Sequence, residues 1–194
     1  NVIFVKCDTW IKYLDLSSES RFRLGARLFT NDRVPGFPGV QAAVDGDSLY
    51  VGAETILYEF DSSFNVLRQV CISEFGFDAS NYRFGLHAYA FNGMLWITVI
   101  HEAHSDCQPL HHRVIQWNTT APPDTGKVSP QYNRYRRWTV DVASNTLYVP
   151  AAKEHDTLRY CFDTEQVEYK SYGLYSYADI QDNMLLLSGS PRLR

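Results

Sequence analysis

A turn followed by a short apolar strand recurs along this chain, and this repeat limits the possible folds more than any other feature. Copies of the unit start about 40 to 50 residues apart. The apolar strands occupy residues 49–53, 95–99, 147–151 and 185–189. The turns before them contain Asp45-Gly46, Asn92-Gly93, Ser144-Asn145 and Asp182-Asn183. Gly and Asn accept the positive φ angles of a tight hairpin, and an apolar run precedes each turn, so each unit is predicted to open with a β-hairpin.

A second marker follows these strands in the same order. A bulky apolar residue ends a strand, and then come Asp or Asn and a hydroxyl residue, which favour a turn. The copies are Phe60-Asp61-Ser62, Trp117-Asn118-Thr119 and Phe162-Asp163-Thr164. Closing strands are predicted at residues 21–29, 66–71 and 167–172. This period and strand content predict an all-β fold, a β-propeller of four-stranded antiparallel blades, whereas the alternative is a β-sandwich with similar hairpins.

The repeat divides the chain into four visible units and a partial one, with approximate bounds 1–32, 33–76, 77–130, 131–173 and 174–194. The first unit lacks its innermost strand, because Val2 matches a second strand. The last unit supplies only two strands. Its first strand could complete the first blade and close a four-bladed ring, but the second would be left over. We therefore favour a stretch of a larger ring of about five to seven blades.

Composition and charge narrow the functional classes. Aromatic residues make up 14% of the chain, with 13 Tyr and 11 Phe against 2 Met, which favours strands. The net charge of −4 supplies no general basic field for nucleic acid. We find no apolar run of the roughly 18 residues that a membrane-spanning helix needs. The chain begins at Asn1 without a recognisable signal peptide, so we expect a processed form or a fragment.

Cysteines and a glycosylation motif favour a secreted or surface-exposed protein. The four cysteines, Cys7, Cys71, Cys107 and Cys161, contain no C-x-x-C pair. An even number fits two disulfides, whose pairing stays open, and the alternative is four reduced core thiols. Asn118-Thr119-Thr120 is an N-glycosylation acceptor in one of the repeated turns, where we expect it to be exposed. Together these features predict an extracellular chain.

In a propeller, the loops between second and third strands and the links between blades share one face, which usually carries ligands. The longest such insertion, residues 101–112, contains the candidate metal ligands His101, His104, Asp106 and His111. Its His-Glu-Ala-His sequence lacks the H-E-x-x-H spacing of helical zinc sites. We interpret the segment as a polar, pH-sensitive loop and predict no metal and no cofactor.

The links between blades supply a second candidate site of Arg and Tyr side chains. Its residues are Arg33, Tyr82, Arg83, Arg134, Tyr135 and Arg136. Such side chains at a rim suit binding to protein or to acidic glycan, although they also simply solubilise long loops. The sequence contains no G-x-S-x-G elbow, P-loop, G-x-G-x-x-G motif or sialidase Asp-box. A non-catalytic function is therefore favoured over an enzyme.

Residues 40–53, which contain Leu49-Tyr50-Val51-Gly52-Ala53, together with residues 56–63 resemble a blade of the Sema domains of plexins and semaphorins. The resemblance implies an extracellular propeller and protein recognition, and no functional residue is transferred. This sequence differs in placing the blade second rather than first, and it lacks the dense cysteines that follow the blade in plexins.

We therefore predict a non-catalytic extracellular propeller that binds another protein or a surface glycan, or that assembles with itself. Nucleic acid and a membrane span are not expected. One alternative is a carbohydrate-active enzyme or lectin that uses the Arg- and His-containing loops. The other is an intracellular Kelch- or WD-like scaffold with reduced thiols.

Overall fold

The computed structural model describes residues 2–7, 10–15, 23–30, 40–63, 65–101, 111–133, 138–150, 156–171, 177–181 and 184–188. In these residues the only helices are two short 3-10 turns, η1 (Ile72–Phe75) and η2 (Pro123–Thr125). All other regular elements are strands, and each strand pairing is antiparallel. The predicted all-β class is confirmed.

Two sheets contain four strands in chain order, as expected for propeller blades. The second sheet consists of β4 (Val40–Asp45), β5 (Ser48–Ala53), β6 (Ile56–Phe60) and β7 (Val66–Cys71). The fourth consists of β13 (Thr139–Asp141), β14 (Thr146–Val149), β15 (Asp156–Cys161) and β16 (Val167–Ser171). In each of them every strand pairs with the next one along the chain, which is the arrangement that consecutive hairpins produce.

The third sheet has an irregular outer edge. It consists of β8 (Tyr82–Phe91), β9 (Met94–His101), β10 (His111–Asn118), β11 (Lys127–Val128) and β12 (Tyr132–Asn133). The two short strands β11 and β12 both pair with β10, at different positions along it. Gly126 and Pro130 lie close to β11, and neither residue type favours a continuous strand. The fourth strand of this sheet is therefore split into two short pieces.

The described residues at the two ends form smaller sheets. The first sheet contains β1 (Val2–Cys7), β2 (Trp10–Asp15) and β3 (Arg23–Thr30), and the last is a hairpin of β17 (Tyr177–Gln181) and β18 (Met184–Ser188). Because β1 and β17 belong to separate sheets, the two ends do not share a blade in this structure.

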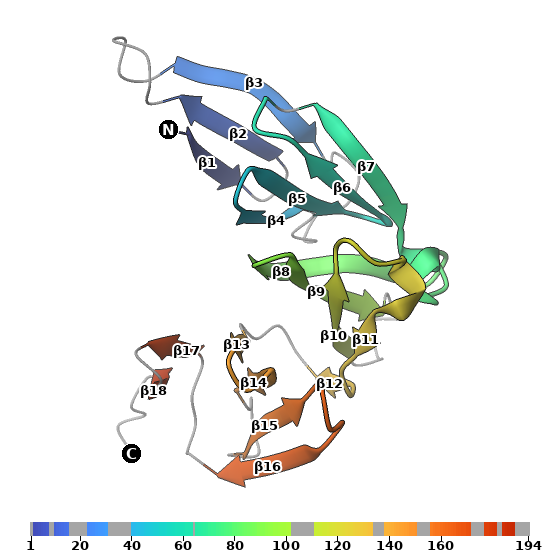
Figure 1. Ribbon diagram of the computed structural model, residues 1–194, viewed down its shortest axis with the longest axis vertical. Helices are drawn as coiled ribbons and strands as arrows, with labels where there is room; N and C mark the ends of the chain where they lie inside the picture. Colours follow the sequence, from blue (N-terminus) through green and yellow to red (C-terminus); the bar gives the residue numbers. More distant parts are fainter. Residues whose placement is uncertain are drawn as a thin grey trace.

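The sheets follow one another along an arc (Figure 1). The strands β1, β4, β8 and β13 lie on its inner side, whereas β3, β7 and β16 lie on its outer side. β4 contacts both β1 and β8, and β13 contacts β17, so the first strands of neighbouring sheets meet near the inner side. This is the radial stacking that lets each blade cover the apolar face of the next.

The residues whose burial the structure describes form two apolar clusters, each between neighbouring sheets. Phe75, Leu95 and Trp117 belong to the cluster between the second and third sheets. Trp96 and Trp138 belong to the cluster between the third and fourth. Successive residues of β9 thus enter different clusters, because side chains alternate between the two faces of a strand. Burial of both faces explains why residues 95–100 are apolar except for Thr98.

Three of the four repeated turns have the predicted backbone geometry, and the fourth, Asp182-Asn183, lies outside the described residues. Gly46, Asn92, Gly93 and Asn145 have φ angles of 56°, 51°, 76° and 49°. In the second marker, Asp61 Oδ1 accepts hydrogen bonds from the backbone N–H groups of Ser63 and Asn65, at 2.9 and 2.8 Å. The carboxylate therefore closes the turn after β6, which is the function that the sequence pattern indicated.

Candidate functional site

A row of ring-bearing side chains crosses one end of the third sheet. Tyr82 on β8 lies opposite His101 on β9, and His101 lies opposite His111 on β10. Directly opposed residues on antiparallel strands place their side chains on the same face. The row therefore lies at the end of the sheet where β8 begins, β9 ends and β10 begins.

The rings of this row are in contact. The ring centroids of Tyr82 and His101 are 4.8 Å apart with an interplanar angle of 67°, and Phe77, in the loop before β8, lies 5.0 Å from Tyr82. The centroids of His101 and His111 are 6.4 Å apart at 43°. All four side chains are partly exposed. We call Phe77, Tyr82, His101 and His111 the aromatic row.

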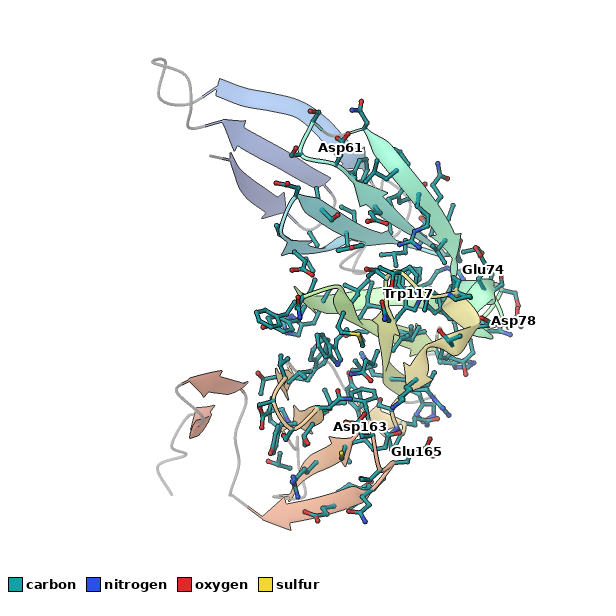
Figure 2. The ribbon with its side chains drawn as sticks, viewed as in Figure 1. Asp61, Glu74, Asp78, Trp117, Asp163 and Glu165 are labelled. Atoms are coloured by element: carbon teal, nitrogen blue, oxygen red, sulfur yellow. The ribbon has the colours of Figure 1, made fainter. Side chains whose placement is uncertain are left out.

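The loop that carries Phe77 is shaped by its own polar groups. Gly76 ends η1 with a φ of 82°. The Asp78 carboxylate accepts hydrogen bonds from the backbone N–H of Ser80 at 2.9 Å and from Asn81 Nδ2 at 2.6 Å. Hydrogen bonds from Ser80 lower the pKa of the Asp78 carboxyl. Figure 2 shows Glu74 and Asp78 together on this segment, where it leaves β7.

Arg83 connects the same loop to β8. Its Nη1 donates hydrogen bonds to the backbone oxygens of Ala79 and Tyr82, at 2.6 and 2.8 Å. Adjacent residues of a strand point to opposite faces, so Arg83 does not extend the aromatic row. The guanidinium thus supports the loop backbone, and its predicted role in ligand binding stays a prediction.

His112 occupies the opposite face of the sheet. It is 2% exposed and lies across from Tyr132 on β12, with ring centroids 5.6 Å apart. Burial, with a smaller contribution from His111, lowers the pKa of His112 to about 4. His112 is therefore a neutral core residue at physiological pH.

The structure corrects the interpretation of residues 101–112 as a single polar loop. His101, His111 and His112 lie on strands β9 and β10, which extend further than the sequence pattern suggested. His104, Asp106 and Cys107 lie outside the described residues. Near these strand ends one face of the sheet is still in the core, because the buried His112 lies opposite the buried Ile100.

The structure describes only part of the predicted Arg and Tyr site. Tyr82 and Arg83 are adjacent at the start of β8. Arg33, Arg134, Tyr135 and Arg136 lie outside the described residues. His101 and His111 join Tyr82, although the sequence analysis assigned these histidines to a separate candidate site. These three residues meet because β9 pairs with both β8 and β10. Tyr82 begins its strand, His101 ends the next strand and His111 begins the third, and these strand ends are the sequence signal for their contact.

The described residues contain no group of three or more His, Cys, Asp or Glu that could hold a metal ion. Cys71 and Cys161 have free thiols in the structure, so the predicted disulfides are not shown. These cysteines end β7 and β15, which belong to different sheets. Cys107 is not among the described residues, nor is the side chain of Cys7, so the disulfides stay a prediction.

The glycosylation motif lies on the surface. Asn118 is exposed at the end of β10, and its Oδ1 accepts hydrogen bonds from Thr120 N and Oγ1, at 3.0 and 2.8 Å. Thr119 between them is buried. Modification of Asn118 stays a prediction.

Among the helices of the described residues, none has the length and apolar character to cross a membrane.

No protein-family model and no curated protein matches this chain. Solved structures do match. A protein of unknown function from Bacteroides caccae has a TM-score of 0.55 at 9% identity, covering 94% of this chain and 62% of the other. The Swd1 β-propeller domain of Myceliophteria thermophila has a TM-score of 0.52 at 8% identity, covering 88% and 57%.

A third match is the crystal structure of a nidogen/laminin complex, with a TM-score of 0.53 at 12% identity, covering 92% of this chain and 66% of the matched one. At these identities the likeness shows the fold alone. The chain has a β-propeller fold and spans 57 to 66% of the length of these three structures. No family or curated match supports the narrower resemblance to plexins and semaphorins.

Proposed function

We propose that this chain is a non-catalytic binding propeller that recognises another protein through the aromatic row of its third sheet. The observation that carries the proposal is the continuous contact of Phe77, Tyr82 and His101, all partly exposed at one end of a sheet. Aromatic side chains are enriched at protein interfaces, where they supply large contact areas. The position of the row agrees with the face that propellers commonly use for ligands.

The row is also held in place before a partner arrives. Tyr82 and His101 stand on paired strands, and the Asp78 hydrogen bonds shape the loop that carries Phe77. Rings fixed in this way lose little conformational entropy on binding, so more of the contact energy remains as affinity. A rigid sheet end is therefore better suited to recognition than an isolated exposed ring.

The comparison with a nidogen/laminin complex supports the same class of function. In that complex, nidogen is a protein bound to another protein. The likeness to this chain concerns the fold, and we infer by analogy that a propeller of this kind presents a protein-binding surface.

Photocrosslinking tests the binding surface. A benzophenone amino acid replaces Tyr82 in one variant and Tyr169 in a control variant; Tyr169 is 64% exposed on β16, in a different sheet. Both variants are incubated with culture medium and with intact cells of the source organism and are then irradiated. We expect discrete protein adducts from position 82 and none from position 169. Equal adducts at both positions, or no adducts together with saturable binding to a glycan array, would contradict protein recognition at this site.

We further propose that the protein is extracellular, which its exposed Asn118 motif and even number of cysteines support. Expression through a eukaryotic secretory pathway, followed by mass measurement with and without glycosidase and reductant, tests this. We expect a glycan that is absent from Asn118→Gln, and a mass increase on reduction. A mass equal to the bare sequence, with four free thiols, would favour an intracellular scaffold.

A further inference from the structure

We propose that His101 and His111 together bind one divalent transition-metal ion, of the class that includes Zn²⁺, Cu²⁺ and Ni²⁺. The two imidazoles supply two ligands and leave the remaining coordination positions open. The proposal concerns binding of the metal itself and does not rest on the proposed recognition of a protein.

The first support is the placement of the two side chains. His101 and His111 are directly opposite on β9 and β10, so both project from the same face of the sheet. Their ring centroids are 6.4 Å apart, and both side chains are partly exposed. A metal ion can therefore approach from solvent without displacing the core.

The second support is that the spacing is close to that of a chelating pair. With zinc–nitrogen bonds of about 2.0 to 2.1 Å, two imidazoles on a tetrahedral ion have ring centres about 5 Å apart. The ring centroids of the observed pair must therefore approach by about 1.4 Å. Small rotations about the side-chain torsions are sufficient, because the terminal torsion of histidine has a broad energy minimum.

The third support is the chemistry and setting of the ligands. Imidazole nitrogens bind zinc, copper and nickel well, whereas calcium and magnesium prefer oxygen ligands. The Tyr82 ring packs against His101 at 4.8 Å and restricts the orientations of its imidazole. One ligand is thus partly oriented in advance, which reduces the entropy lost on binding.

The other described histidines are placed differently. His112 follows His111 on the strand and so faces the core, where its ring contacts Tyr132. His87 lies against the Trp138 ring at 4.6 Å, and its Nε2 is 3.1 Å from the Trp138 backbone oxygen. Among the described histidines, the geometry therefore selects His101 and His111.

Metal titration of the chelator-treated 194-residue chain tests the pair. With Zn²⁺ in a calorimeter we expect one site per chain. With Cu²⁺, electron paramagnetic resonance should show coupling to two nitrogen nuclei. His101→Ala and His111→Ala should each lower the affinity at least about tenfold and leave coupling to at most one nitrogen.

Control variants test whether the metal is bound by this histidine pair or by another part of the chain. Tyr169→Phe, on β16 of another sheet, leaves both imidazoles and the Tyr82 ring in place, so it should bind metal as the parent chain does. Cys71→Ser and Cys161→Ser should also bind normally. Circular dichroism and thermal melting establish that each variant is folded, and histidine nitrogen NMR of the unmodified chain, with and without Zn²⁺, identifies the ligands without substitution.

Zinc-dependent shifts confined to His101 and His111 would support the proposal. Absence of a stoichiometric site in the parent chain would overturn it. Binding that survives both alanine substitutions in folded variants, or that disappears with a cysteine substitution, would also overturn it, because the metal would then be held elsewhere.

Discussion

The indole Nε1 of Trp138 donates a hydrogen bond of 2.8 Å to Thr98 Oγ1, which joins the segment before β13 to β9 of the neighbouring sheet. The Thr98 hydroxyl in turn donates to the backbone oxygen of His87 at 2.9 Å. Both Trp138 and Thr98 are buried. The third and fourth sheets are thus held by a satisfied buried polar contact as well as by apolar packing.

Removal of the Trp138 donor should weaken this interface. We expect Trp138→Phe to lower the free energy of unfolding by about 2 kcal/mol, because ring volume and one buried hydrogen bond are lost. Urea denaturation measures the change, and a double-mutant cycle with Thr98→Val isolates the bond. Additive effects of the two substitutions would contradict a direct interaction.

Acid should destabilise the fold through His112. Its pKa of about 4 in the folded protein lies below its ordinary value of 6.5, so the unfolded chain binds the proton more readily. Stability should therefore be retained above pH 6.5 and fall progressively down to about pH 4, by about 3 kcal/mol in total. Denaturation at several pH values measures this loss. In His112→Phe, which cannot titrate, the decrease over this range should largely disappear.

A methyl group at position 85 should not fit the third sheet. A Cβ on Gly85 would lie 2.4 Å from Ile100 Cγ1 and 2.5 Å from Ile100 Cδ1. We expect Gly85→Ala to cost about 1 to 3 kcal/mol of stability, as overpacked cores do. Adding Ile100→Val removes the Cδ1 atom and should restore part of the loss in thermal or urea denaturation. No rescue would mean that the Cδ1 atom of Ile100 is not the obstacle.

Replacement of Arg68 by lysine should destabilise the protein more than the same replacement of Arg159. Arg68 Nη2 donates to Glu59 Oε2 and to the Thr119 backbone oxygen, both at 2.7 Å, and its Cζ lies 4.6 Å from the Trp117 ring centroid. We expect Arg68→Lys to cost about 1 to 2 kcal/mol, because lysine cannot reproduce the fork and the stacking.

Arg159 provides the matched comparison. It forms an ion pair of 2.8 Å with Glu168 on the adjacent strand, and its side chain is 35% exposed. Arg159→Lys should change stability by less than about 0.5 kcal/mol. Urea denaturation of both variants in low and high salt measures the two changes in unfolding free energy. Equal changes would contradict a special role for Arg68.

Local patterns predicted most of the strands. Asn92-Gly93 specified a hairpin by its own backbone preferences, and Asp61 specified the turn after β6 by its own carboxylate. Such signals involve neighbouring residues, so they can be read without knowledge of the rest of the chain. The short strand β11 was not predicted, because two residues are too few to show the alternation of apolar and polar side chains that indicates a strand. Only its pairing with β10 defines it.

The candidate site was only partly predictable. Tyr82 was identified from its position in a link between blades, and His101 and His111 from their residue type. Their union in one row depends on the register of β9 with β8 and β10, which a shift of one residue would abolish by turning the side chains to the other face.

The all-β class, the hairpin units and their order follow from local sequence, because these features depend on turn chemistry and on short apolar runs. Which faces of the sheets are buried follows only from how the sheets pack in three dimensions. This packing makes His112 a core residue beside its partly exposed neighbour His111, and it links Trp138 to Thr98 across two sheets. These outcomes require knowledge of what covers each sheet, and that depends on residues far apart in the chain.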